Sequence, residues 1–207
     1  MHKTDPADVM GVILAGGLSR RMAGQEKASL ALNGKTLLER MVFSLTPQVA
    51  TLAINANGDA SRFASFGLPV FPDLRTDFPG PLAGIETALT MATMPWVLTV
   101  PTDLPFLPQN LVWILCQATQ DPVIPVTVAT GERLHPTVAL WPRQIRPKIT
   151  EALDAGQLAL GQWFAGHPHR VVEFPLRADA PDPFFNINTP MDLAAAHQWL
   201  ECGLARS

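Results

Sequence analysis

The stretch VILAGGLSRRMAGQEK, residues 12–27, decides the fold of this chain. Its first three residues are apolar and predict the end of a strand, which stops at the paired glycines Gly16 and Gly17. Glycines at the end of a strand let backbone N–H groups approach an anion closely, because no Cβ stands in the way. The stretch therefore predicts a turn from strand to loop that holds the phosphates of a nucleotide.

Three cations follow these glycines, although the whole chain carries a formal charge of -3. Arg20, Arg21 and Lys27 can supply the local positive charge that a triphosphate needs. The alternative is an ordinary glycine-rich turn with a solvated basic rim. We disfavour it because the same geometry must also explain the polar residues that end the other predicted strands.

Other phosphate and nucleophile motifs do not fit. Gly34-Lys35-Thr36 imitates the end of a Walker A motif, but Ser29 stands where the earlier glycine is required, and no strand leads directly into the segment. The chain has no G-x-G-x-x-G, and residues 17–21 lack the second glycine of a serine-hydrolase elbow.

Short apolar runs alternate with stretches of helical periodicity, which is typical of an α/β fold with a mainly parallel sheet flanked by helices. We predict a single Rossmann-like domain over residues 1–207, with a nucleotide half at about 1–120 and a substrate half at about 121–207. A turn at 130–132 predicts a small antiparallel excursion. The predicted strands are 9–15, 51–55, 69–71, 96–100, 123–128, 137–141 and 171–174, and the predicted helices are 37–45, 82–92, 111–118, 143–155, 157–165 and 191–200.

Polar residues end three of the predicted strands: Asn55, Asp73 and Asp103. The carboxyl ends of parallel strands lie along one edge of a sheet, where open α/β folds bind their ligands, so we expect these residues to converge with the glycine loop. Asp103 is the candidate magnesium ligand, because a carboxylate beside nucleotide phosphates suits a hard cation. Taken alone, an Asp at a strand end is more often a helix cap or turn former.

The segment Phe184–Pro190 precedes the last predicted helix. Thr189 and Pro190 form an N-cap followed by proline at the first helical position. Asn186 and Asn188 are two positions apart, so in an extended segment their side chains point the same way and can hydrogen-bond a ligand or a metal-bound water. A site role and a turn-forming role stay equally open for them.

Composition narrows the class of protein further. The negative net charge argues against general nucleic-acid binding, and no apolar stretch is long enough to cross a membrane or to form a signal peptide. Cys116 and Cys202 have no ligand spacing, so we expect two reduced packing residues. We expect a cytoplasmic protein.

Taken together, these segments resemble the molybdenum cofactor guanylyltransferases, within the wider nucleotidyltransferases that share a nucleotide-diphospho-sugar transferase-like fold. One departure is Ala23, where the family usually has glycine, and this difference changes none of the charged residues of the motif. The matching segments are LAGGLSRRM…K at 14–27, INAN at 54–57, FPGPLAG at 78–84, TDLPF at 102–106, GERLHPT at 131–137 and NINTP at 186–190.

The resemblance implies a set of roles. The pterin substrate is implied to bind toward the later part of the chain, near Asn186 and Asn188, with His135 on that side as a lining or a structural residue. Asp103 is implied to hold Mg2+ as well as GTP. The residues expected to contact GTP are Leu14, Ala15, Gly16, Gly17, Arg20, Lys27, Asn55, Asp73 and Asp103, of which Lys27 and Asp103, with Arg21, are the catalytic candidates.

The reaction that this predicts is the transfer of GMP from GTP to the terminal phosphate of Mo-molybdopterin, with release of pyrophosphate. Two alternatives stay open: a cytidylyltransferase acting on the same pterin or another phosphorylated metabolite, and a nucleotide-binding regulator without turnover. We expect a monomer that makes transient contacts with cofactor-biosynthesis and acceptor proteins.

Overall fold

The computed structural model of the chain describes residues 4–16, 27–75 and 80–204, apart from the side chain of Lys27. Its centre is a seven-stranded sheet of order β5-β4-β1-β6-β8-β7-β9, in which β8 alone runs antiparallel to its neighbours. The strands are β1 (Val9–Leu14), β4 (Thr51–Asn55), β5 (Val70–Phe71), β6 (Trp96–Pro101), β7 (Val126–Thr130), β8 (Arg133–Pro142) and β9 (Arg170–Glu173).

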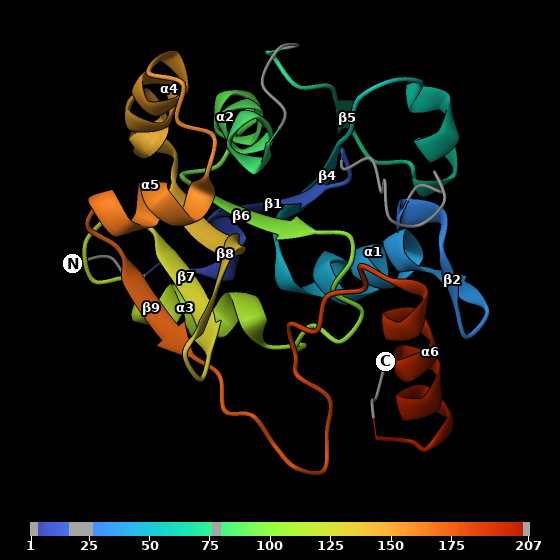
Figure 1. Cartoon of the computed structure of the whole chain (residues 1–207). Helices are drawn as coiled ribbons and strands as arrows, with labels where there is room; N and C mark the ends of the chain where they lie inside the picture. The colour runs from blue at the N-terminus through green and yellow to red at the C-terminus, as the bar shows by residue number, and fades with distance from the viewer. Residues whose placement is uncertain (1–3, 17–26, 76–79, 205–207) are drawn as a thin grey trace.

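Helices cover both faces of this sheet (Figure 1). One face packs against α2, α4 and α5, and the other packs against α1 and α3. The last helix, α6, lies beyond the ends of the strands (Figure 1). The helices are α1 (Leu37–Leu45), α2 (Pro81–Met91), α3 (Leu111–Ala118), α4 (Arg146–Asp154), α5 (Leu160–Gly166) and α6 (Pro190–Glu201).

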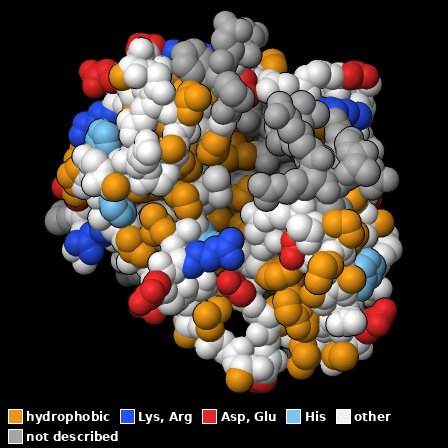
Figure 2. Space-filling view, viewed as in Figure 1, with side chains coloured by type: hydrophobic (Ala, Val, Ile, Leu, Met, Phe, Trp, Pro, Cys, Tyr) orange, Lys and Arg blue, Asp and Glu red, His pale blue; other side chains and the backbone are white. Residues whose placement is uncertain are grey.

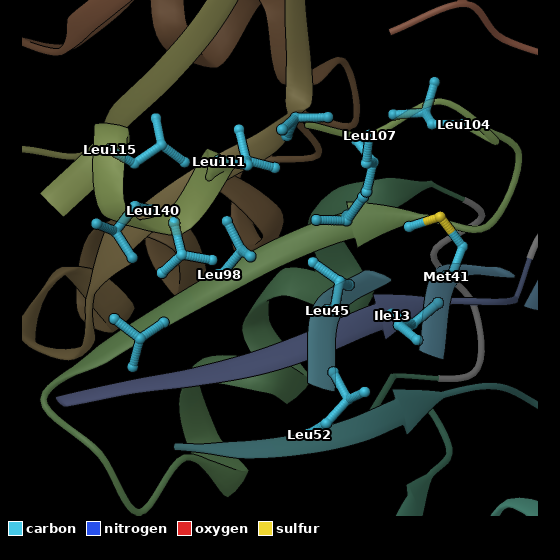
Figure 3. Close-up of a cluster of buried hydrophobic side chains, with 14 of the residues drawn as sticks. Ile13, Met41, Leu45, Leu52, Leu98, Leu104, Leu107, Leu111, Leu115 and Leu140 are labelled. Carbon is cyan, nitrogen blue, oxygen red and sulfur yellow. The ribbon is translucent and has the colours of Figure 1, made fainter. Parts of the chain in front are cut away.

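The core under α1 and α3 explains why these two segments are helical. Their apolar residues recur every three or four positions, so each helix presents one apolar stripe to the sheet. Figure 3 shows Met41 and Leu45 of α1 in the same apolar cluster as Ile13 of β1 and Leu52 of β4. Burying such side chains contributes about 1.5–3 kcal/mol each, which sets the position of both helices.

Local signals also explain how two helices begin. Thr36 opens α1 with a capping box in which its hydroxyl accepts from the Glu39 N–H and the Glu39 carboxylate accepts from the Thr36 N–H. Thr189 opens α6 in the same way with Asp192, and Pro190 takes the first helical position, which confirms the predicted cap.

A short hairpin was missed from the sequence. β2 (Ala31–Leu32) and β3 (Lys35–Thr36) pair across an Asn33–Gly34 turn in which both residues have positive φ, at 50° and 77°. Asn-Gly is the strongest short hairpin signal, but strands of two residues carry no alternation to read. The hairpin confirms that Gly34-Lys35-Thr36 does not form a phosphate loop.

Other boundaries differ modestly. The strand expected at 123–128 begins only at Val126, because the chain first turns at Asp121. The Asp121 carboxylate accepts from the Val123 N–H, and its carbonyl accepts from the Ile124 N–H. The expected antiparallel excursion is confirmed, but β8 is longer than the predicted 137–141 and lies between β6 and β7. Cys116 is buried as expected, whereas Cys202 is exposed, so its predicted packing role is wrong.

Short 3-10 segments lie before or between these elements in the described part of the chain. They are η1 (Pro6–Asp8), η2 (Lys27–Ser29), η3 (Thr46–Gln48), η4 (Ala60–Phe66) and η5 (Arg143–Ile145).

Candidate functional site

The ends of three neighbouring strands form the floor of the candidate site. Leu14 at the end of β1 lies in register with Asn55 of β4 on one side and Pro101 of β6 on the other. The Ala15 N–H donates to the Asn55 carbonyl at 2.8 Å, so the first residue after β1 is fixed against β4. The part of the predicted convergence that brings Asn55 beside the start of the glycine loop, at Leu14 and Ala15, is confirmed.

Asp73 joins this edge through two asparagine side chains. Asn55 Nδ2 donates to Asp73 Oδ1 at 2.9 Å, and Asn57 Nδ2 donates to Asp73 Oδ2 at 2.8 Å. In return, the Asp73 N–H donates to Asn57 Oδ1 at 2.8 Å. Asn55 is only 3% exposed, so this network holds the carboxylate in one orientation. Asn57 was not among the predicted site residues, although its alternation with Asn55 after a strand was a usable signal.

Gly16 lies beside the same network. A Cβ at Gly16 would come no closer than 3.8 Å to a described atom, the Nδ2 of Asn57, which is ordinary contact. Among the described residues, nothing therefore requires glycine at position 16. Its predicted contact with GTP stays a prediction.

Asp103 occupies the other side of the floor, just after β6. It is 7% exposed, and its carbonyl accepts from the Ile187 N–H at 2.9 Å. That hydrogen bond brings the segment with Asn186 and Asn188 next to the β6 end. The roles predicted for these asparagines stay predictions, and the structure adds that their segment lies beside Asp103.

The two asparagines differ in their surroundings. Asn186 Oδ1 is buried and accepts no hydrogen bond within the described residues. The Asn188 N–H donates to the Asp192 carboxylate at the start of α6, which gives its backbone a capping role. A buried amide oxygen without a partner costs about 1–3 kcal/mol, so Asn186 is the better candidate for a ligand contact.

The first turns of α2 press against the strand ends. A Cβ at Gly84 would lie 2.5 Å from Asn55 Oδ1 and 3.2 Å from Leu14 Cδ2, so this helix can approach the site only because residue 84 is glycine. Sequence reasoning did not include Gly84 in the site. Its position inside the FPGPLAG segment was the available signal.

Buried polar groups of α2 also anchor the chain that follows Asp73. Thr87 Oγ1 accepts from the Leu74 N–H, and Glu86 forms a bidentate ion pair with Arg75 at 2.7 and 3.0 Å. Arg75 reaches on to Asp154 of α4 at 2.6 Å. These contacts fix the position from which Asp73 meets the two asparagines.

The predicted cationic loop lies outside the described residues, which include neither Gly17, Arg20 nor Arg21. Lys27 opens η2, but its side chain is outside the described part. These predicted contacts therefore stay predictions. Within the described ranges, no group of three or more His, Cys, Asp or Glu side chains could hold a metal ion.

His135 does not line an open surface. It is 6% exposed, its ring lies 5.0 Å from that of Phe184, and its Nε2 is 2.8 Å from Thr130 Oγ1. Burial lowers the pKa of His135, Arg133 adds to that effect, and Asp182 opposes it. Of the two roles left open for His135, the structure supports the structural one.

A groove of about 1160 Å³ lies beside α1. It is lined by the β2–β3 hairpin, α1 and residues 105–109, and contains none of the predicted site residues. We place the site by its polar groups rather than by the size of this groove. Figure 2 shows a different apolar area over α6, where Phe106, Phe185 and Leu193 are partly buried.

None of the helices in the described ranges combines the length and apolar composition that a bilayer crossing requires.

Comparison with solved structures identifies the fold. A molybdopterin-guanine dinucleotide biosynthesis protein A from Archaeoglobus fulgidus superposes with a TM-score of 0.76 at 24% identity, covering 93% of this chain and 99% of that one. A CMP:2-keto-3-deoxy-manno-octonic acid synthetase in complex with CTP gives a TM-score of 0.74 at 14% identity, covering 94% and 99%. The chain therefore has a nucleotidyltransferase fold.

Sequence comparison identifies the family. The family model of the MobA-like NTP transferase domain matches residues 11–171. The molybdenum cofactor guanylyltransferase of Rhodopseudomonas palustris (strain BisB5) is 44% identical over 204 residues, which cover 95% of this chain and 94% of that protein. The enzyme of the same name from Rhizobium meliloti (strain 1021) is 44% identical over 209 residues, covering 96% and 94%. With its strand-end site and this similarity over nearly its whole length, the chain belongs to the molybdenum cofactor guanylyltransferases, within the MobA-like NTP transferase family.

Proposed function

We propose that the strand-end site binds GTP and transfers its GMP moiety to the terminal phosphate of Mo-molybdopterin. The reaction releases pyrophosphate and forms the guanine dinucleotide form of the molybdenum cofactor. The observation that carries this proposal is the meeting of Ala15, Asn55, Asp73 and Asp103 at adjoining strand ends in a member of this family.

The chemistry is an in-line displacement at phosphorus. An oxygen of the molybdopterin phosphate attacks the α-phosphorus of GTP, and the bond from that phosphorus to the oxygen bridging to the β-phosphorus breaks. The nucleophile is already an anion, so no side chain has to remove a proton. The task of the protein is then to align the two substrates and to balance negative charge.

The described residues can perform the alignment. Asn55 and Asn57 hold the Asp73 carboxylate in one orientation, where it can accept hydrogen bonds from the nucleoside. We place the purine beside Gly16, because a residue without a Cβ exposes its backbone to a ligand. Arg20, Arg21 and Lys27 supply the charge that holds the departing pyrophosphate in this proposal.

A magnesium ion fits the chemistry of the Asp103 side of the site. Mg2+ is usually held by one or two carboxylates together with substrate phosphates, rather than by a cage made only of protein groups. Asp103 offers one buried carboxylate at the predicted phosphate position. When bound, the ion neutralises the charge of the phosphates.

Asn186 and Asn188 are our candidates for the pterin side, and Asn186 has the stronger support. The amide of Asn186 can accept and donate hydrogen bonds with the ring nitrogens and carbonyl of a pterin. The product must then pass to an acceptor protein, and we expect that contact to be transient. A monomer working in the cytoplasm remains our prediction.

Pyrophosphate release tests this proposal. The protein should release pyrophosphate from GTP only when Mo-molybdopterin and Mg2+ are both present, in a one-to-one ratio with the dinucleotide product. Asp103→Asn keeps the shape of the side chain but removes its charge, so release should fall by roughly 10² or more.

Asp179→Asn is the matched control, because Asp179 is exposed in an ion pair with Arg177. It should stay within about twofold of wild type. Pyrophosphate release at the wild-type rate by a folded Asp103→Asn protein would sink the assignment of the metal site.

A further inference from the structure

The pairing of β8 with its two neighbouring strands is interrupted near the site. β8 pairs with β6 only as far as Thr99 and Ala139, so the last two residues of β6 have no partner in β8. Against β7, the register jumps from Thr127 opposite Ala139 to Val128 opposite His135. Residues 136–138 of β8 therefore form a bulge, which redirects the half of β8 that carries His135.

Two buried threonines hold the bulge in place. Thr127 Oγ1 lies 3.2 Å from the His135 carbonyl and 3.0 Å from the Val138 carbonyl. Thr99 Oγ1 donates to the Thr137 carbonyl at 3.0 Å. Both threonines are fully buried, so the bulge is a fixed feature of the sheet.

The segment from Asp182 to Ile187 lies beside this bulge. Phe184 packs its ring against the rings of His135 and Phe174, both at 5.0 Å, and is itself fully buried. Ile187 is also fully buried and donates its N–H to the Asp103 carbonyl. Asn186 lies between these two anchored residues.

His135 contacts this segment at a second point. Its Nε2 lies 2.8 Å from Thr130 Oγ1, and that hydroxyl donates to Asp182 Oδ2 at 3.3 Å. A hydroxyl carries one proton, so when that proton goes to Asp182 the His135 ring must be the tautomer that donates from Nε2 to Thr130. Asp182 Oδ1 in turn accepts from the Phe184 N–H at 2.8 Å.

We propose that His135 is a positioning residue for the pterin substrate. Through the Phe184 ring and the Thr130–Asp182 hydrogen bonds, it fixes the segment that carries Asn186. This inference rests on the proposed function, in which Asn186 contacts the pterin. The strands β1 and β6 lie between β4 and β8, so His135 is separated from Asn55 and Asp73. We therefore expect its loss to affect the pterin more than the nucleoside, although the same segment also contacts the Asp103 carbonyl through Ile187.

A pair of variants separates the hydrogen bond from simple packing. His135→Leu fills the space against Phe184 but cannot donate to Thr130. His135→Gln can reach the same hydroxyl with its amide. We expect His135→Leu to raise KM for Mo-molybdopterin about tenfold, which is what one lost hydrogen bond implies, with KM for GTP within about twofold of wild type. His135→Gln should restore most of the difference.

Thr130→Val is the second variant, because it removes the hydroxyl without changing the size of the side chain and remains informative where His135→Leu fails to fold. It should show the same rise in KM for the pterin alone. Urea unfolding of each protein measures how much stability is lost. An equal rise in both KM values, an unchanged pterin KM or no recovery in His135→Gln would each overturn the inference.

The proposed function is tested separately in the same assay. If wild-type protein does not transfer GMP to Mo-molybdopterin, the proposed function fails. If wild type transfers GMP and Asn186→Ala raises the pterin KM while His135→Leu and Thr130→Val do not, only the positioning role of His135 fails.

Discussion

Gly84→Ala is the substitution whose consequences the structure defines most closely. The added Cβ would lie 2.5 Å from Asn55 Oδ1, a distance that real Cβ atoms essentially never show, and 3.2 Å from Leu14 Cδ2. Asn55 is 3% exposed and cannot move into solvent. Asn55 Nδ2 donates to Asp73 Oδ1 at 2.9 Å and to the Phe71 carbonyl at 3.1 Å. In the variant, either α2 shifts outward or the Asn55 amide rotates and loses these two hydrogen bonds.

The magnitude follows from these contacts. Overpacking a buried site costs about 1–3 kcal/mol, and each buried hydrogen bond that is lost costs about 1 kcal/mol. Replacing a helical glycine by alanine returns at most about 1 kcal/mol. We therefore expect Gly84→Ala to lower the free energy of unfolding by about 1–4 kcal/mol and to raise KM for GTP at least about tenfold, because Asp73 loses its orientation.

Urea unfolding and steady-state kinetics measure the two effects. Gly161→Ala in α5 is the control, since a Cβ there meets no described atom within 4 Å. It should leave KM for GTP unchanged and stability equal to or slightly above that of wild type. If Gly84→Ala behaved like Gly161→Ala, the contact between α2 and Asn55 would not support the site.

Three further predictions concern charge, nucleotide choice and pH. Lys27→Ala should reduce kcat/KM for GTP by roughly 10², because it removes the positive charge that is positioned to stabilise the leaving pyrophosphate. An unchanged value would make Lys27 an ordinary surface residue. Gly16→Ala should leave the free energy of unfolding unchanged, since its Cβ would stay 3.8 Å from Asn57 Nδ2. In competition assays it should nevertheless reduce kcat/KM for GTP more than for CTP. An equal effect on both nucleotides would contradict the fit of guanine at this position. Burial lowers the pKa of His135 below its unfolded value of about 6.5, so the unfolded chain takes up a proton first as pH falls. The contribution of His135 to the free energy of unfolding should be fully present above about pH 6.5 and should be lost as pH falls toward the folded pKa. Between about pH 7.5 and pH 5, the free energy of unfolding in urea should therefore fall less for His135→Gln than for wild type. An equal fall in both proteins would assign the acid sensitivity to other groups.

The grouping of polar residues at the strand ends could be predicted from the sequence, because it follows from a general property of parallel sheets. Parallel strands place their carboxyl ends along one edge, so Asn55, Asp73 and Asp103 were expected together, and the structure brings Asn55 into contact with Asp73. The guanylyltransferase assignment, made from the motifs, is confirmed by relatives with 44% identity. Roles of individual residues stay predictions, including those of Arg20, Arg21 and Lys27.

Other parts of the site depend on contacts between distant segments and could not be read in this way. Gly84 matters because of the distance from α2 to β4, and no local pattern reports that distance. The β8 bulge shifts the register after Thr127, and this shift depends on how β8 pairs with β6 and β7 rather than on a local pattern. The role of Phe184 depends on that bulge, since its ring meets the redirected His135.

The most direct test of the central claim is a crystal structure with GTP and Mg2+ bound. We expect guanine beside Gly16 and Asn57, the nucleoside within hydrogen-bond distance of Asp73, and a magnesium ion held by Asp103 beside the phosphates. GTP bound instead in the groove beside α1, or a metal ion held without Asp103, would show that the strand ends are not the nucleotide site.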